Sequence, residues 1–127
     1  MFINISRYGS STWGEEWHEE AKKYGKIVDL KAPNVNPEAS PLEVWDIAKG
    51  LLDNVWDLQH EYSLPCTMIC LGGIESTLMY AVVRLFLEHG LKVCRAVERE
   101  NEDGLYEFVR FREFINHNIY EEENEND

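Results

Sequence analysis

Two different spacings of hydrophobic residues alternate along this chain. Strand-like stretches, which either alternate apolar and polar residues or are almost wholly apolar, cover residues 2–5, 26–30, 65–71, 91–97 and 106–111. Helical stretches, in which apolar residues recur every three or four positions, cover residues 13–24, 41–62 and 75–89. The sequence therefore predicts the order strand, helix, strand, helix, strand, helix, strand, strand.

Capping and turn residues support these boundaries. Ser40 and Glu43 have the spacing of a capping box in front of the second helix. Ser11 or Thr12 is expected to cap the first helix. The run 101–104 is typical of a hairpin turn, so the last strand is expected to be antiparallel. This order predicts one α/β domain, a mostly parallel sheet with helices on both faces and an antiparallel C-terminal edge strand.

The composition fits a single small domain, because the chain has 127 residues of which 44% are hydrophobic. We expect the domain to span residues 1–115, followed by a disordered acidic tail over 116–127, where the last seven residues hold five acids and no base. The net charge of −12 argues against a long nucleic acid as partner, since such binding relies on Lys and Arg. No apolar run approaches the ~20 residues that cross a bilayer. Three cysteines without paired spacing indicate a reducing compartment, so we expect a cytoplasmic protein with no membrane partner.

The loop after the first predicted strand carries candidate ligand-binding groups, because ligands of open α/β sheets bind beyond the carboxyl ends of the strands. The candidates here are Arg7, Tyr8, Gly9, Ser10, Ser11 and Thr12. A cation, an aromatic plane and three hydroxyls are groups that bind a phosphate and a base. A capped polar loop whose arginine pairs with a surface acid explains the same residues equally well.

The loop after the third predicted strand is the second candidate region. It offers Gly72, Gly73, Glu75, Ser76 and Thr77. The glycines let backbone approach a ligand closely, and the helix start presents free N–H groups that suit a phosphate. Glu75 would repel an anion unless it caps the helix or faces a hydroxyl, and a plain strand-to-helix turn is the alternative interpretation. Arg99 follows the fourth strand and offers a second cation, unless it simply pairs with Glu98 or Glu100.

The sequence lacks the spacings of a metal site or of a catalytic nucleophile. It contains no H-E-x-x-H and no C-x-x-C, and its four histidines are scattered. Cys66 and Cys70 share one side of a predicted strand, which predicts buried structural thiols. The four tryptophans are expected in the core or in an interface; they are Trp13, Trp17, Trp45 and Trp56. We therefore expect no metal and no cofactor.

Three features of this layout recur together in one known group of proteins. They are a short first strand that leads into a Ser/Thr-rich loop (5–13), a buried strand that ends in Gly72-Gly73 and continues to Thr77, and a late strand that ends at 97–99. In these features the chain resembles the small Rossmann-like proteins of type III CRISPR systems, the CARF-type sensors and the ring nucleases that degrade cyclic oligoadenylate. The likeness covers residues 1 to about 114 and is one of layout and loop character.

The resemblance implies a homodimer whose loops enclose a small cyclic RNA across a two-fold axis. It also implies metal-independent cleavage, in which a ribose 2′-hydroxyl attacks the adjacent phosphorus and the protein positions the ligand and stabilises charge. Arg7 and Ser11 are then the candidates for catalysis, and the other loop residues and Arg99 are candidates for ligand binding. The acidic body, Glu75 inside the ligand loop and the lack of a nearby lysine depart from that pattern.

Two other functions fit the same sequence. The first is a non-catalytic α/β module that binds a ligand or another protein. The second is a small enzyme that acts on a mononucleotide or a sugar phosphate.

Overall fold

A computed structural model describes residues 1–116 of the chain. Its elements are β1 (Phe2–Ser6), the 3₁₀ turn η1 (Ser10–Thr12), α1 (Glu15–Lys22), β2 (Ile27–Lys31), α2 (Pro41–Tyr62), β3 (Met68–Gly72), α3 (Ser76–Glu88), β4 (Val93–Glu100) and β5 (Tyr106–Glu113). The five strands form one sheet in the order β2-β1-β3-β4-β5. The neighbours β2-β1, β1-β3 and β3-β4 are parallel, whereas β4 and β5 are antiparallel.

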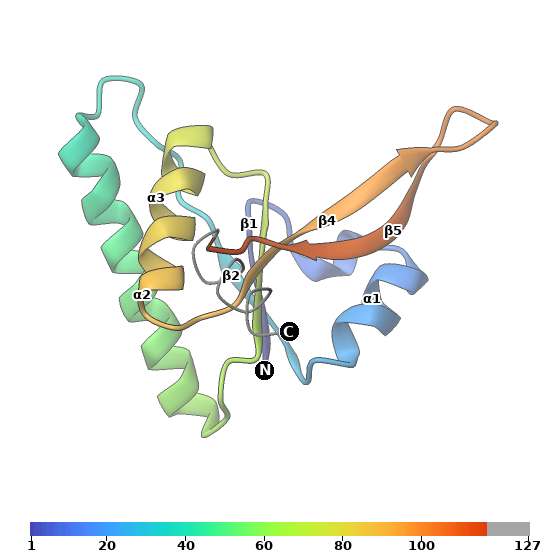
Figure 1. Cartoon of the computed structure of the whole chain (residues 1–127), viewed down its shortest axis with the longest axis horizontal. Coiled ribbons are helices and arrows are strands. Elements are labelled where there is room, and N and C mark those ends of the chain that lie inside the picture. Colours follow the sequence, from blue (N-terminus) through green and yellow to red (C-terminus); the bar gives the residue numbers. More distant parts are fainter. Residues whose placement is uncertain (117–127) are drawn as a thin grey trace, which may run out of the picture.

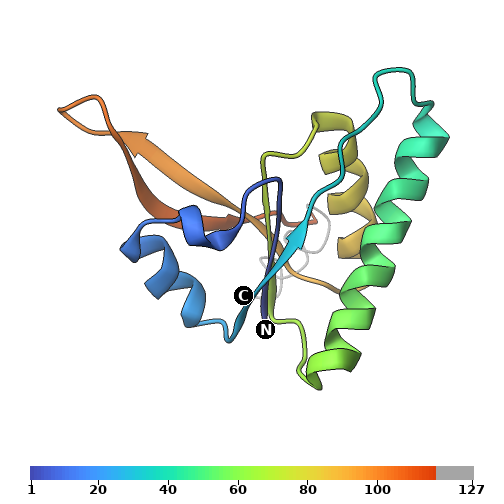
Figure 2. The same cartoon turned by 180° about the vertical axis from the view of Figure 1, so that it is seen from behind.

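The predicted fold class is confirmed, because the sheet has a mostly parallel, Rossmann-like topology with an antiparallel C-terminal edge strand. The two helices α2 and α3 cover one face of the sheet, and α1 covers the other (Figures 1 and 2). The acidic tail predicted over 116–127 falls, apart from its first residue, outside the described part of the chain.

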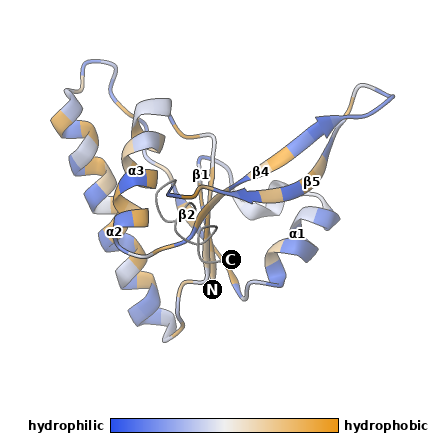
Figure 3. Ribbon diagram, in the orientation of Figure 1, coloured by the Kyte–Doolittle hydropathy of each residue, from blue (hydrophilic) through white to orange (hydrophobic). Residues whose placement is uncertain are grey.

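Alternating strand residues supply the two cores on either side of the sheet. Ile3 and Ile5 of β1 are fully buried in the core beneath α2 and α3. Phe2, whose side chain points to the opposite face of the strand, belongs to the second core beside α1. Figure 3 shows the apolar stripes of α2 and α3 turned toward each other and toward the sheet. This is the arrangement that a period of two in strands and of 3.6 in helices dictates.

The tryptophans divide between these two cores. Trp45 packs against the core beneath α2 and α3, and Trp13 and Trp17 pack against the core beside α1. Trp56 is 39% exposed on α2. Three of the four indoles therefore contact a core as predicted, and an interface position for Trp56 stays a prediction.

The helix ends test the capping predictions. The Ser40 hydroxyl accepts from the Glu43 N–H at 3.2 Å and the Glu43 side chain reaches back to the Ser40 N–H, so the capping box is confirmed. The cap of α1 was predicted wrongly, because its N-cap is Gly14 and no side chain bonds there. Ser11 lies inside η1, and the Thr12 hydroxyl donates to the Gly9 carbonyl at 2.8 Å. The Thr12 hydroxyl thus closes a separate 3₁₀ turn before the helix begins.

The sheet divides between β3 and β4. Only two residue pairs join these strands, Ile69 with Val93 and Cys70 with Cys94. Beyond Cys94, β4 continues for six residues paired with β5 alone, and the two strands project from the body as a long hairpin (Figure 1). The divergence leaves an opening beside the carboxyl end of β3.

Candidate functional site at the switch point of the sheet

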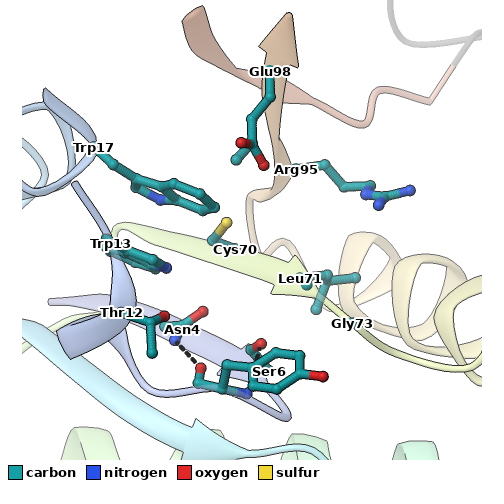
Figure 4. A pocket seen from close by; sticks show the side chains of 13 residues that line it. Asn4, Ser6, Thr12, Trp13, Trp17, Cys70, Leu71, Gly73, Arg95 and Glu98 are labelled. Carbon is teal, nitrogen blue, oxygen red and sulfur yellow. Dashed lines mark hydrogen bonds between the residues drawn. The ribbon is translucent and has the colours of Figure 1, made fainter. Parts of the chain in front are cut away.

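A cavity of about 220 Å³ lies at the carboxyl ends of β1 and β3 (Figure 4). In the sheet, β1 has β2 on one side and β3 on the other, so the chain changes direction across the sheet between β1 and β3. This is the point where the strand order reverses. Ligands of open α/β sheets bind at such points. The volume is smaller than the ~300–1,000 Å³ of most small-molecule sites, so the cavity accommodates one part of a larger ligand.

Aromatic rings form one wall of the cavity. The indoles of Trp13 and Trp17 are stacked with centroids 4.8 Å apart, and the second face of Trp17 stacks on Phe108 at 5.6 Å. The faces of Trp17 are therefore occupied. Tyr8 is 63% exposed and its ring lies over Gly73, where an added Cβ would come within 3.6 Å of it. The exposed Tyr8 ring leaves a face available to a ligand.

The glycines at the end of β3 lie against the first loop. Gly73 has a φ of +60°, a conformation that L side chains rarely adopt. At Gly72 an added Cβ would lie 3.5 Å from the Ser6 hydroxyl oxygen. That oxygen accepts from the Tyr8 N–H at 3.1 Å, which fixes the start of the first loop. The loops after β1 and β3 therefore meet at this cavity.

A buried amide and a carboxylate hold the first loop in place. Asn4 is 2% exposed, and its Nδ2 donates to the Tyr8 carbonyl at 3.2 Å and to Asp29 Oδ1 at 2.9 Å. The Asp29 carboxylate also accepts from the N–H and the hydroxyl of Ser10, each at 3.0 Å. Asn4 Oδ1 keeps no hydrogen bond within residues 1–116 and points toward the cavity (Figure 4). The polar groups of Ser10 are thus bonded to a carboxylate of the protein.

The start of α3 is likewise bonded to a carboxylate of the protein. Glu75 is the N-cap, and its side chain accepts from the N–H groups of Thr77 and Leu78 at 3.0 Å each and from the Thr77 hydroxyl. These hydrogen bonds, foremost that of the hydroxyl, lower the pKa of Glu75. Ser76 and Thr77 line a different hollow, of about 430 Å³, between α2 and α3.

The charged groups around the cavity come from β4. Arg95 and Glu98 both line it. Figure 4 shows the Glu98 carboxylate directed toward the cavity and the Arg95 guanidinium pointing away from the indoles. Arg7 is exposed in the first loop and does not line the cavity. Arg99 lies farther along the hairpin, where its Nε donates to Glu107 at 2.8 Å, so its partner is neither of the glutamates beside it.

The structure thus gathers some of the predicted site residues and separates others. The cavity is lined by Tyr8, Thr12, Gly72 and Gly73, whereas Gly9, Ser10 and Ser11 belong to the same loop without lining it, and Glu75, Ser76, Thr77, Arg7 and Arg99 lie elsewhere. Their roles in binding and catalysis stay predictions. Sequence reasoning missed the other nine lining residues, which are Asn4, Ser6, Trp13, Trp17, Cys70, Leu71, Arg95, Ala96 and Glu98. A usable signal existed for Asn4, a polar residue inside an otherwise apolar strand.

Cys70 and Cys94 are buried, whereas Cys66 lies before β3 and is only partly buried, so the prediction of a buried strand thiol is confirmed for Cys70 and wrong for Cys66. Burial raises the pKa of Cys66 to about 11, and the pKa of Cys94 is raised by its hydrogen bond with Cys70 and by burial. A raised pKa keeps these thiols protonated and unreactive at neutral pH. Within residues 1–116 no group of three His, Cys, Asp or Glu side chains is arranged to hold a metal ion.

The chain matches no protein-family model, no curated protein and no solved structure with which it was compared. Among the helices of the described part, none has the length and apolar character needed to cross a membrane.

Proposed function

We propose that this chain binds cyclic oligoadenylate and that one adenosine unit of the ring occupies the switch-point cavity. The class of ligand comes from the resemblance of layout described above. The observation that supports it is a cavity that combines an available aromatic face, that of Tyr8, with hydrogen-bond acceptors. Stacking on an aromatic side chain is the usual way in which an unpaired base is held.

The polarity of the cavity favours a nucleoside over a phosphate. Asn4 Oδ1 and the Glu98 carboxylate are acceptors that face the cavity. Acceptors bind the exocyclic amine of adenine and the hydroxyls of ribose, whereas a carboxylate repels a phosphate. The phosphates of the ring are therefore expected to lie outside the cavity.

The size of the cavity favours two copies of the chain around one ring. A volume of about 220 Å³ leaves most of a cyclic oligonucleotide outside. A second protomer related by a two-fold axis would hold the opposite nucleoside in the same way. The proposal therefore includes a homodimer, to be measured by light scattering after size exclusion with and without ligand.

Ring cleavage is the second part of the proposal. Attack by the 2′-hydroxyl needs donors and cations beside the scissile phosphate. The Ser10 N–H is bonded to Asp29 and the amides at the start of α3 are bonded to Glu75, which favours the non-catalytic binding module as the alternative. Arg7 is exposed in the first loop, and within residues 1–116 it has no ion pair. It stays the candidate cation for cleavage.

Calorimetry with cyclic tetra-adenylate and cyclic hexa-adenylate tests binding, and product analysis in EDTA tests cleavage. Tyr8→Ala removes the stacking ring, which is worth about 1–3 kcal/mol per base, and is expected to weaken binding by about 5- to 150-fold. Tyr80→Ala is the matched control, because Tyr80 is also 60% exposed but lies on α3 beside the other hollow.

Each outcome has a distinct meaning. Turnover that persists in EDTA supports the ring nuclease, and binding without turnover supports the module. If neither ring binds, or if the two tyrosine variants weaken binding equally, the proposal is wrong.

A further inference from the structure

The arginines of this chain are concentrated on its C-terminal hairpin. The sequence has six arginines, and four of them lie on β4 and β5. The strand register places Arg95 opposite Arg112, Val97 opposite Arg110, and Arg99 opposite Glu107. Residues paired across antiparallel strands point to the same face of the sheet. We call this surface, made by Arg95, Arg99, Arg110 and Arg112, the arginine face.

The arginine face points away from α1. Phe108 and Phe111 of β5 occupy the opposite face and belong to the core beside α1. Arg95, Arg110 and Arg112 are exposed. The hairpin that carries them stands clear of α2 and α3 over most of its length (Figures 1 and 2). The surface is therefore accessible to a large ligand.

Three of these arginines have no partner in the described part of the chain. Only Arg99 forms an ion pair, with Glu107. Like charges placed directly opposite each other, as Arg95 and Arg112 are, destabilise a strand pair. The chain has 24 acidic residues with which to neutralise them and a net charge of −12. A patch of unpaired cations on so acidic a protein is explained by an anion that binds there.

The arginine face adjoins the switch-point cavity. Another hollow, of about 380 Å³ and distinct from the one between α2 and α3, lies at the base of the hairpin. Arg95 and Arg112 both line it. Arg95, Ala96 and Glu98 line both this hollow and the cavity. The two spaces therefore meet along β4 at the place where it has left β3. A chain molecule seated in the cavity can therefore continue past Arg95 onto the arginine face.

We propose that Arg95, Arg110 and Arg112 hold the phosphodiester chain of the oligoadenylate. The identity of this ligand rests on the proposed function, whereas the anion site rests on the arginines themselves. A guanidinium offers a planar fork of donors that matches phosphate oxygens, which suits it to this contact better than an ammonium. The adjoining cavity with its aromatic wall favours a nucleotide chain over an acidic peptide. Glu98 and Glu113 at the edge of the hollow restrict the phosphates to the hairpin side.

Substitution of single arginines tests the proposal. Arg110→Gln and Arg112→Gln are compared with Arg84→Gln, a matched control on α3 whose side chain contacts Tyr80 and Glu88. The probes are cyclic hexa-adenylate and a fluorescent linear oligoadenylate, each titrated from low to physiological salt. Each hairpin variant is expected to weaken binding severalfold and to reduce the salt slope by about 0.7 per lost phosphate contact, whereas Arg84→Gln leaves both unchanged. Circular dichroism confirms that the variants fold.

The outcomes separate this inference from the proposed function. If the rings bind but the hairpin variants change neither affinity nor salt slope, the arginine face is not the phosphate site and the proposed function stands. If neither ring binds but the linear oligonucleotide binds through the hairpin arginines, the anion site stands and the cyclic ligand is wrong. If a glutamate-rich peptide of equal charge displaces the oligonucleotide at equal concentration, the surface recognises acidic peptides and the proposal is overturned.

Discussion

Replacement of Asp29 by alanine should destabilise the protein and loosen the first loop at the same time. The Asp29 carboxylate accepts hydrogen bonds from Asn4 Nδ2 at 2.9 Å and from the N–H and hydroxyl of Ser10 at 3.0 Å. The loop that contains Tyr8 is thereby fastened to β2. Because Ser10 and Asp29 are far apart in the sequence, the unfolded chain does not retain these contacts.

The magnitude follows from the number of bonds and their exposure. A hydrogen bond contributes about 0.5–1.5 kcal/mol net, and more when one partner is charged. Asp29 is exposed, which places its three bonds near the lower end of that range. Asn4 keeps its bond to the Tyr8 carbonyl, so the buried amide is not left without a partner. The expected loss is about 2 kcal/mol, or about 8 °C in Tm for a domain of this size.

Urea denaturation followed by far-UV circular dichroism measures this loss. Asp46→Ala is the control, because Asp46 is also exposed and its ion pair with Lys49 is 3.9 Å long. That change is expected to stay within about 0.5 kcal/mol of the parent. Equal destabilisation by the two substitutions would show that the bonds of Asp29 contribute nothing beyond those of an ordinary surface carboxylate, and the reasoning would be refuted.

The same variant links stability to ligand binding. With Asp29 removed, Tyr8 keeps only the bonds of its backbone to Ser6 and Asn4. Well below the Tm of the variant, affinity for cyclic tetra-adenylate should fall, because the ligand must now order the loop. Unchanged affinity in a destabilised variant would mean that the loop does not contribute to the site.

Three further changes test separate parts of the structure. Gly73→Ala should cost about 1–2 kcal/mol in urea denaturation, because Gly73 has a φ of +60° and an L side chain there is strained; an unchanged midpoint would contradict the turn geometry. Cys66, with a pKa of about 11, should resist alkylation at pH 7.5, and so should the buried Cys94; fast labelling of the folded protein would contradict the raised pKa. The pKa of Glu75 is lowered in the folded state, so its stabilisation is complete above its unfolded pKa and is lost as pH falls through the folded value. The difference in urea midpoint between the parent and Glu75→Gln should therefore shrink from pH 6 to pH 3, and a constant difference would refute this.

The order and type of the elements were predictable because each depends on local periodicity. The apolar residues of α2 recur at helical spacing for the whole length from Pro41 to Tyr62, and Ser40 with Glu43 marks its start. The start of α1 was not predictable in this way. Trp13 has helical spacing to Trp17, but it lies before the first residue of the helix. Its ring stacks on that of Trp17 without being one helical turn away from it.

The candidate site was less predictable, because it depends on which strands pair and for how long. Residues 91–97 have the pattern of a strand whether or not β3 runs beside them, and nothing in the pattern shows that the pairing ends after Cys94. That early end opens the cavity and turns Arg95 and Glu98 of β4 into its lining. Sequence reasoning looked for cations in loops and so chose Arg7, whereas the alternation of β4 and β5 had already placed the arginines of the hairpin on one face. Had strand alternation been applied to polar residues as it was to apolar ones, the even spacing within each strand would have predicted one face for Arg95 and Arg99 and one face for Arg110 and Arg112. That these two faces are the same follows only from the register of β4 and β5.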